Sequence, residues 1–351
     1  MKRFLCLILS AVLCVIFSSC TNKNIKYVKQ GNISFNYNNI FAGFGGPYFW
    51  VDENGVYRVE DGILGVCSVI NETGKRFFVP RHTPRTDMHT YNGELFFLAS
   101  SDFVEYSLVK YDISSKKETE IVTFQPEGIH QHQYCIFDNT LYVETGSNEE
   151  YVQNITAISL KTNEITNVAN DVFWWGVADG AVRYIMRSND EYKVYQYDAY
   201  NNTSFFLGQF ETELQNSEFF ERGVNFTSDT VILELYDPTN FILRMIVYNV
   251  KTGEISTHEL SCRLNCLVAY DKYIFVATIE ESENDPPTRK NKLFRVCLEN
   301  FQMEEIGDFY GDDIYLFVTS DNDVFVASSD FDEIYHCTSQ GIGENILVNK
   351  K

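Results

Sequence analysis

The sequence has few basic residues, few prolines and a single long apolar run. Its 351 residues include 28 Lys and Arg against 49 Asp and Glu, which gives a formal net charge of −21 at pH 7. A chain this acidic is repelled by phosphate backbones, so we expect no nucleic-acid partner. Only 7 prolines occur, while aromatic residues make up 15% of the chain. Such a composition favours β-strands over most of the length.

Familiar catalytic motifs are missing. The sequence contains neither a Gly-x-Ser-x-Gly nucleophile elbow nor a Gly-x4-Gly-Lys-Ser/Thr phosphate loop. The close pair Cys262 and Cys266 has no second pair at a spacing that would complete a zinc site. We therefore predict no cofactor, no metal and no catalytic residue, and favour a role other than an enzyme.

The N-terminal segment has the pattern of a signal peptide. Two basic residues precede an uncharged apolar run at 4–17, and two serines and Cys20 follow it. The run is shorter than the roughly 20 residues that span a bilayer, so we do not expect a transmembrane helix. Residues 17–20 resemble the lipobox of bacterial lipoprotein precursors, although Phe17 stands where Leu is common.

This resemblance implies cleavage after residue 19 and acylation of Cys20, for example by palmitate. We expect a signal peptide at 1–19, a lipidated cysteine and tether at 20–32, and an extracytoplasmic domain at 33–351, anchored by lipid to the bacterial cell membrane. Simple secretion with cleavage near Ser19 is the alternative. Six cysteines remain in the mature chain; most lie in apolar strand patterns, so we favour buried thiols over disulfides.

A hairpin signal recurs along the whole mature chain. It consists of an Asp, Asn or Gly turn between two apolar or aromatic runs, which suits tight β-hairpins. Its seven instances lie at 50–57, 89–97, 135–142, 176–182, 226–232, 268–274 and 318–325. A second polar turn follows each of them, at 71–75, 113–117, 160–164, 199–203, 250–254, 298–302 and 339–343.

The repeat is about 45 residues long, which is the length of a four-stranded propeller blade. We predict an all-β fold with a single β-propeller, most simply of seven blades, with six or eight as alternatives. Residues 33–40 are a candidate extra strand that would close the ring. Two β-sandwiches are the rival architecture, but they would not explain one recurring hairpin.

The chain resembles uncharacterised β-propeller lipoproteins of bacteria and, more loosely, TolB-like and WD-like propeller repeats. It lacks the Trp-Asp dipeptide of the latter. The resemblance implies a rigid monomeric platform and transfers no activity, because no residue set of known function matches.

In a propeller, the segments that join one blade to the next meet around the mouth of the central channel. Aromatic, histidine and arginine side chains gather in these segments and would suit a glycan, peptide or protein ligand. The ligand-binding hypothesis names Arg81, His82, Arg85, His130, His132, Trp174, Trp175, Arg222 and Arg263. The alternative is that these are ordinary loop residues and that the tryptophans pack between blades.

Three other hypotheses about function stay open. A metal site formed by His82, His89, His130 and His132 is conceivable. A propeller-type glycan hydrolase or lyase would use carboxylates and His at the channel mouth, for which Glu221, Asp312 and Asp313 are the candidate acids. A receptor that binds a protein partner through an exposed aromatic patch is the third.

Overall fold

The structure is a computed structural model of the whole chain. It describes residues 49–52, 55–61, 67–71, 76–78, 81, 89–91, 94–102, 104–112, 115–125, 134–147, 152–178, 181–212, 218–270, 272–281, 289–310, 314–318, 324–328, 334–338 and 341–345. The predicted signal peptide, Cys20, the tether and the candidate strand at 33–40 lie outside this part. No helix able to cross a membrane is found within these ranges.

The described residues form seven four-stranded antiparallel sheets, each built from four consecutive strands. We number them blades 1 to 7 in chain order. Blades 1 to 3 contain β1 (Phe49–Asp52), β2 (Gly55–Asp61), β3 (Cys67–Asn71) and β4 (Arg76–Phe78); β5 (His89–Tyr91), β6 (Glu94–Ala99), β7 (Tyr106–Asp112) and β8 (Lys117–Phe124); and β9 (Tyr134–Phe137), β10 (Thr140–Ser147), β11 (Val152–Ser159) and β12 (Ile165–Val172). Blades 4 and 5 contain β13 (Trp174–Ala178), β14 (Ala181–Ser188), β15 (Glu191–Asp198) and β16 (Thr203–Glu211); and β17 (Phe220–Phe226), β18 (Thr230–Asp237), β19 (Ile242–Asn249) and β20 (Ile255–Ser261). Blades 6 and 7 contain β21 (Leu264–Tyr270), β22 (Tyr273–Glu281), β23 (Arg289–Cys297) and β24 (Met303–Tyr310); and β25 (Ile314–Val318), β26 (Val324–Ser328), β27 (Ile334–Thr338) and β28 (Gly341–Asn345).

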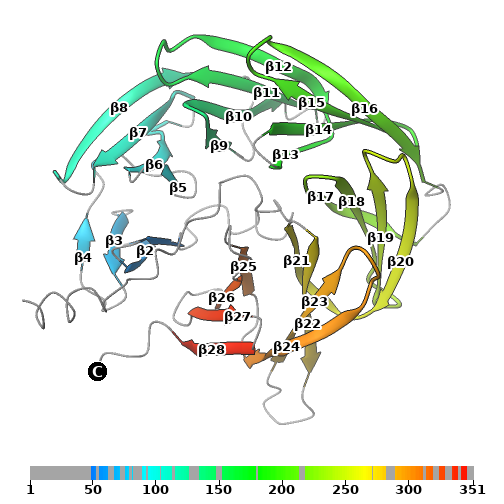
Figure 1. Cartoon of the computed structure of the whole chain (residues 1–351). Helices are drawn as coiled ribbons and strands as arrows, with labels where there is room; N and C mark the ends of the chain where they lie inside the picture. Colours follow the sequence, from blue (N-terminus) through cyan, green and yellow to red (C-terminus); the bar gives the residue numbers. More distant parts are fainter. Residues whose placement is uncertain are drawn as a thin grey trace, which may run out of the picture.

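The blades are arranged side by side around a centre, with the first strand of each blade innermost (Figure 1). First strands of successive blades contact one another, for example β13 with β17 and β21 with β25. The prediction of an all-β propeller of four-stranded sheets is confirmed, and a pair of β-sandwiches is excluded by this arrangement. Every one of the fourteen predicted turns falls between the first and second or the third and fourth strand of a blade.

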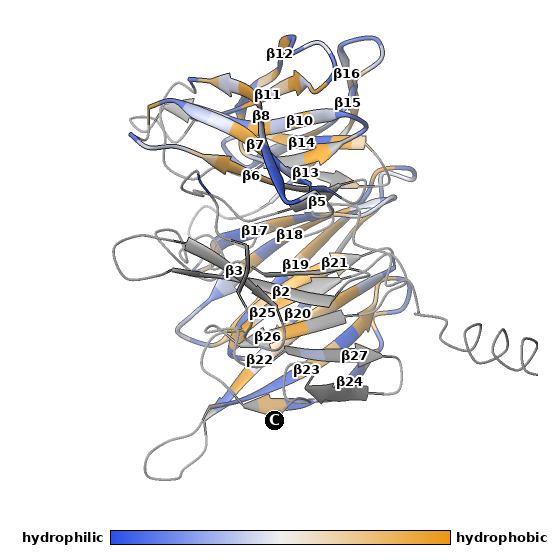
Figure 2. Cartoon of the chain, turned by 90° about the vertical axis from the view of Figure 1, so that its left-hand side faces the viewer, coloured by the Kyte–Doolittle hydropathy of each residue, from blue (hydrophilic) through white to orange (hydrophobic). Residues whose placement is uncertain are grey.

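Burial decreases from the inner to the outer strands. In blade 5 seven of the eight residues of β18 are buried, whereas none of the residues of β20 is. Along the middle strand β15, buried residues such as Tyr192 and Val194 alternate with partly exposed residues. In the side view apolar residues follow the strands of the stacked sheets, and β8 is mainly hydrophilic (Figure 2). The core is therefore distributed between neighbouring blades, as in the cluster that joins Trp174 to Leu233.

The turns between third and fourth strands are built by short polar side chains. The Asn249 side-chain oxygen accepts hydrogen bonds from the backbone N–H groups of Lys251 and Thr252, at 2.9 and 3.1 Å, and Asp198 does the same in blade 4. Such side chains mimic a backbone turn. The turn then passes through a left-handed residue, Asn202 in blade 4 and Gly253 in blade 5.

A backbone hydrogen bond connects the two predicted turns within a blade. The N–H of Leu160 donates to the carbonyl of Asn139 at 2.8 Å in blade 3, and that of Val250 donates to Asp229 at 2.9 Å in blade 5. In blade 6 Leu298 donates in the same way to the carbonyl of Lys272 at 2.8 Å. Both turns of a blade therefore lie on the same face of the propeller and are held together there.

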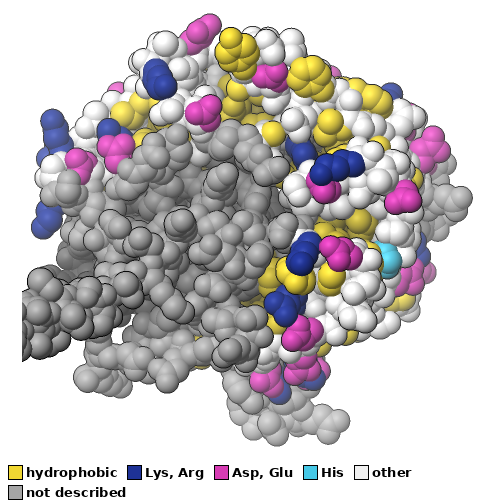
Figure 3. Space-filling view, in the orientation of Figure 1, with side chains coloured by type: hydrophobic (Ala, Val, Ile, Leu, Met, Phe, Trp, Pro, Cys, Tyr) yellow, Lys and Arg dark blue, Asp and Glu magenta, His cyan; other side chains and the backbone are white. Residues whose placement is uncertain are grey.

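Opposite charges lie beside each other on the face drawn in Figure 3, with hydrophobic side chains between them. Exposed ion pairs of the chain include Lys251 with Asp229 and Arg295 with Glu304, both at 2.6 Å. Such exposed pairs contribute about 0–1 kcal/mol each to stability.

Candidate functional site

Four of the nine predicted ligand-binding residues lie outside the described residues: His82, Arg85, His130 and His132. Ligand binding by them stays a prediction. Arg81 is exposed, and its backbone N–H donates to a carboxylate oxygen of Glu118 at 2.8 Å. The other four, Trp174, Trp175, Arg222 and Arg263, lie on blades 4 to 6.

Trp174 and Trp175 open β13 and point to opposite sides of blade 4. Trp174 packs in the apolar cluster between blades 4 and 5, and Trp175 in the cluster between blades 3 and 4. Their exposed fractions are 4% and 2%. Neither ring therefore offers a face to a ligand in this structure, and both contribute to the contacts between blades.

The junction between blades 3 and 4 contains a buried acid. Glu144 lies on β10, and the indole N–H of Trp175 donates to one of its carboxyl oxygens at 3.2 Å. Burial raises the pKa of Glu144 to about 8, and the hydrogen bond from Trp175 opposes the rise only in part. This side chain is therefore mainly protonated at neutral pH.

The junction between blades 5 and 6 contains a second buried acid, Glu234, on β18. The amide of Asn225 donates to one carboxyl oxygen of Glu234 and accepts a hydrogen bond from the backbone N–H of Ala269 in blade 6, at 3.0 Å. Burial raises the pKa of Glu234 to about 7, and the charge of Arg222 opposes the rise. The other carboxyl oxygen has no hydrogen-bond partner among the described residues.

Arg222 is the extra residue of a β-bulge in β17, because its neighbours Glu221 and Gly223 pair with the consecutive residues Leu235 and Glu234 of β18. Its guanidinium donates to the backbone carbonyls of Leu264 and Asn265 in blade 6. Arg222 is 4% exposed, so its charge interacts strongly with the carboxyl group of Glu234. The predicted ligand-binding residue thus makes its visible hydrogen bonds to the next blade.

A matching bulge in β21 places Asn265 at the same depth in blade 6. Its side-chain amide donates to the side-chain oxygen of Asn291 on β23 at 2.8 Å, and Asn291 is fully buried. The two bulges therefore lie next to each other: Arg222 donates to backbone carbonyls of blade 6, and the Asn265 side chain donates to Asn291 within blade 6.

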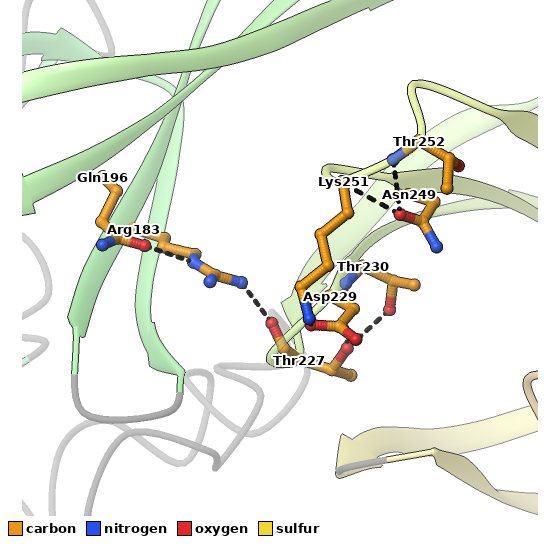
Figure 4. Close-up of polar contacts among 8 residues, drawn as sticks. All are labelled: Arg183, Gln196, Thr227, Asp229, Thr230, Asn249, Lys251 and Thr252. Atoms are coloured by element: carbon orange, nitrogen blue, oxygen red, sulfur yellow. Dashed lines mark hydrogen bonds and ion pairs between the residues drawn. The ribbon is translucent and has the colours of Figure 1, made fainter.

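Blades 4 and 5 are held together at the other end of β17, away from the bulge at Arg222 (Figure 4). The guanidinium Nε of Arg183, on β14, donates a hydrogen bond to the side-chain oxygen of Gln196 at 3.2 Å. The same guanidinium also donates to the backbone carbonyl of Thr227 in the β17–β18 turn. The same turn is closed by Thr227 and Thr230, and its Asp229 pairs with Lys251. Polar contacts thus fix blade 4 against blade 5.

Glu221 was the one candidate catalytic acid that falls among the described residues. Its carboxylate accepts hydrogen bonds from the hydroxyl of Tyr192 and, at 2.5 Å, from the guanidinium of Arg187, both in blade 4. Burial raises the pKa of Glu221, against the lowering effect of these two partners. The group combines a carboxyl, a phenol and a guanidinium within hydrogen-bond distance.

Aromatic and arginine side chains gather at the end of blade 5 where β17 begins and β18 ends, on both sides of the blade. Phe219 packs on the side toward blade 4, and the buried Tyr236 packs on the side toward blade 6. We name this end of the blade the aromatic–arginine face, and it consists of Phe219, Phe220, Tyr236, Phe241, Arg244 and Arg263. The guanidiniums of Arg244 and Arg263 lie over the rings of Phe219 and Phe241, at 4.0 and 5.6 Å from the ring centroids. The rings of Phe220 and Tyr236 meet edge to face at 6.0 Å.

Two rings of this face reach solvent, since Phe220 is 49% and Phe241 is 44% exposed. Phe241 also adopts a left-handed backbone conformation with φ of 54°, which costs a bulky residue about 1–2 kcal/mol. Its carbonyl accepts a hydrogen bond from the N–H of Cys262 at 2.8 Å. A strained, half-exposed aromatic residue held by its neighbours is the kind of outlier that points to function.

Metal and thiol chemistry are not indicated within the described ranges. No group of three or more His, Cys, Asp or Glu side chains converges there; the histidines of the alternative metal site lie outside, except for His89, of which only the backbone is described. Cys262, Cys266 and Cys297 are free thiols. Burial raises the pKa of Cys262 to about 12, so it is an inert thiol at neutral pH.

Comparison with known proteins supports the fold and nothing finer. Neither the protein-family models nor the curated proteins give a match to the sequence. Among solved structures, an oligogalacturonate lyase in complex with manganese is similar with a TM-score of 0.54 at 11% identity, over 90% of this chain and 91% of that one. A putative 6-phosphogluconolactonase from Bacteroides uniformis is similar with a TM-score of 0.51 at 12% identity, over 83% and 90%. The tricorn protease gives 0.55 at 12% identity; the match covers 87% of this chain and 34% of the tricorn chain.

Proposed function

We propose that this protein is a lipid-anchored, extracytoplasmic binding module whose rigid propeller presents the aromatic–arginine face to a ligand or protein partner. Cys20 provides the anchor in this proposal, and the polar contacts at the junctions hold blades 4 to 6 in fixed positions. Binding residues on a rigid scaffold lose little conformational entropy on association.

One observation carries the proposal: Phe241 is strained, half exposed and covered on one side by Arg263. Stability alone would favour Asn or Gly at this backbone conformation. Half-exposed aromatic rings beside arginines are typical of the residues that dominate binding energy in protein interfaces.

The test is the variant Phe241→Asn in the mature chain, assayed on a panel of immobilised cell-surface glycans and a peptide library. We expect binding of the parent protein to at least one member, and a loss of about tenfold or more in affinity for the variant. The free energy of unfolding should stay equal or rise, because the strain is removed. Unchanged binding, or no binding by the parent protein to either panel, would refute the proposal.

The anchor is tested separately by metabolic labelling with an alkyne-bearing palmitate analogue. The parent protein should be labelled and sediment with membranes, and Cys20→Ala should lose both properties. A labelled Cys20→Ala protein would show that the lipid is attached elsewhere.

A second candidate function rests on Glu221. A partly buried carboxyl with a raised pKa, in contact with a tyrosine and an arginine, has the character of a general acid in glycan cleavage. Incubation with acidic and neutral oligosaccharides should then yield products that Glu221→Gln fails to form. Equal product yields from both proteins, or none from the parent, would eliminate it.

A further inference from the structure

A polar cluster between blades 5 and 6 connects the interior of the protein with the aromatic–arginine face. Glu234 is fully buried on β18, and Tyr236 of the face lies two residues further along the strand, so both side chains point toward blade 6. In β17, Arg222 lies between Gly223 and Phe220, the pairing partners of these two residues. Its guanidinium carbon is 5.7 Å from the centre of the Tyr236 ring. Arg222 therefore lies between the buried acid and the face.

Two buried polar atoms of this cluster have no hydrogen-bond partner among the described residues. One carboxyl oxygen of Glu234 accepts a hydrogen bond from the amide of Asn225, whereas the other oxygen is unpaired. The Nε of Arg222 is an unpaired donor. An unpaired oxygen costs more free energy on a carboxylate than on a neutral carboxyl, because a buried charge needs hydrogen bonds. Loss of the proton from Glu234 should therefore draw the guanidinium of Arg222 toward this oxygen.

The other nitrogens of Arg222 hold the chain that enters blade 6. They donate to the backbone carbonyls of Leu264 and Asn265, and the hydrogen bond to Leu264 is long, at 3.5 Å. The N–H of Leu264 donates in turn to the hydroxyl of Tyr236 at 3.4 Å. Arg222 and Tyr236 therefore support the same stretch of backbone, and movement of the guanidinium would weaken that support.

The same stretch of backbone carries part of the aromatic–arginine face. It contains Arg263, whose guanidinium lies over the ring of Phe241, and Cys262, whose N–H donates to the carbonyl of Phe241 at 2.8 Å. Phe241 has a strained backbone conformation that depends on such neighbours. A shift of Arg222 toward Glu234 would thus reach the half-exposed ring through the backbone next to Arg263.

Glu234 is the group at this junction that changes its charge near neutral pH, since burial raises its pKa to about 7. The other titratable or charged groups facing it from β17, β18, β20 and the β20–β21 connection are Arg222, Tyr236, His258, Cys262 and Arg263. Both arginines stay charged. Burial raises the pKa of the tyrosine and of the thiol and lowers that of the histidine, so these three are neutral at pH 7.

The remaining elements of the junction contribute no buried charge on this side. β19 faces it with apolar side chains. On β22 to β24 the charged residues that face this side lie in surface ion pairs or are exposed: Glu280, Lys290, Lys292, Glu305 and Asp308. Solvent screens such groups, so their effect on Glu234 is small.

We propose that the proton on Glu234 regulates the aromatic–arginine face through Arg222, so that the face binds strongly when Glu234 is neutral and weakly when it is ionised. This inference rests on the proposed function, because it names the regulation of the same site. With the proton in place, Arg222 supports the backbone next to Arg263. Without it, the guanidinium turns to the carboxylate and the support is lost. By reciprocity, a molecule that binds the face raises the proton affinity of Glu234.

The first test needs no ligand. Phe241 is replaced by para-fluorophenylalanine in the mature chain, and its fluorine resonance is followed from about pH 5 to pH 9. We expect one titration step with a midpoint near the Glu234 pKa of about 7. Glu234→Gln should abolish the step. Arg222→Lys, which keeps the charge but lacks the planar fork, should reduce it.

Two matched controls remove other titrating groups. Glu144→Gln changes the buried acid of the junction between blades 3 and 4, and His258→Gln removes the histidine at the outer part of the same junction. Both variants should keep the titration step. No step in the parent protein, a step that persists in Glu234→Gln, or a step that is lost in His258→Gln would overturn the inference.

The second test measures binding of the dye anilinonaphthalene sulfonate, whose rings and anionic group suit phenyl rings beside arginines. The part of its binding that Phe241→Asn removes reports this face. The affinity of that part should fall about fivefold or more from pH 6 to pH 8.5 in the parent and stay constant in Glu234→Gln. A pH-independent affinity in the parent overturns this inference and leaves the proposed function standing. Failure of the glycan and peptide panels together with a pH-dependent dye affinity has the opposite meaning.

Discussion

The two junctions that bury a glutamic acid are built differently. Between blades 3 and 4, Glu144 is supported by the indole N–H of Trp175 and no cation lowers its pKa, which is about 8. Between blades 5 and 6, Glu234 has both an amide partner and the guanidinium of Arg222 nearby, and its pKa is about 7. The same side chain is thus kept neutral at one junction and close to ionisation at the other, and the difference is the buried arginine.

The largest effect should come from Arg222→Met. The change removes the donors to two carbonyls of blade 6 and leaves Glu234 buried without a cation, so the free energy of unfolding should fall by about 3–5 kcal/mol. Urea denaturation at pH 7 measures it. Arg295→Met, which removes an exposed partner of Glu304, is the control and should cost about 0–1 kcal/mol. Equal losses would show that burial of the guanidinium is not decisive.

The next effect is the dependence of stability on pH. Both acids have folded pKa values above the ordinary 4.5, so the native state keeps protons that the unfolded chain has lost, and stability falls as pH rises until each folded pKa is passed. From pH 6 to 9 the fall should be on the order of 2–4 kcal/mol. Glu234→Gln should flatten the profile below about pH 7, and Glu144→Gln should flatten it up to about pH 8. Parallel profiles for the parent and the double variant would contradict the assignment.

Trp175→Phe tests the junction between blades 3 and 4 alone. The variant retains an aromatic ring but removes the N–H donor to Glu144, which should cost about 1–3 kcal/mol. Trp174→Phe is the matched control, because it shortens the neighbouring indole without touching Glu144. The cost of the Trp175 variant should increase above pH 8, where the carboxylate needs the donor more, whereas that of the control should not change with pH.

The smallest effect is expected for Glu144→Gln at pH 6. The side chain is already neutral there, and the amide oxygen can accept the same hydrogen bond from Trp175, so stability should change by less than about 1 kcal/mol. The same change at an ionised, paired glutamate would be more costly. A loss above about 2 kcal/mol at pH 6 would mean that Glu144 is ionised in the folded protein.

The blade pattern was predictable because the residues of each turn specify its hairpin without help from distant parts of the chain. A turn such as Asp138-Asn139 requires left-handed residues, and both have positive φ in the structure. The same kind of turn recurs at a constant spacing, so one interpretation fits the whole chain. What local sequence could not predict is which side chain crosses to the next blade, because that depends on the bulges at Arg222 and Asn265, which leave no mark in composition.

Ligand binding at the predicted site stays a prediction, and the positions of its residues were predictable only in part. Arg263 lies on the connection into blade 6, whereas Arg222 lies within β17. Trp174 and Trp175 were named as candidate ligand-binding residues, but each lies in a cluster between blades, as the alternative interpretation expects. The buried acids were missed although a signal existed: Glu234 interrupts an otherwise apolar run on the innermost pair of strands, and a lone acid in such a run must be paired or protonated.

The hydrogen bond between the two turns of a blade divides the propeller into a constant face and a variable one. The donor and the acceptor are 21 residues apart in blades 3 and 5, and 26 apart in blade 6. Of the five additional residues of blade 6, two lengthen β22 and β23 by one each and three lie between these strands, whose shared ends point away from the two hydrogen-bonded turns. Chain length can therefore change on that face by insertion without disturbing blade assembly, so the aromatic–arginine face belongs to the side of the molecule where new recognition loops can evolve at little cost to folding.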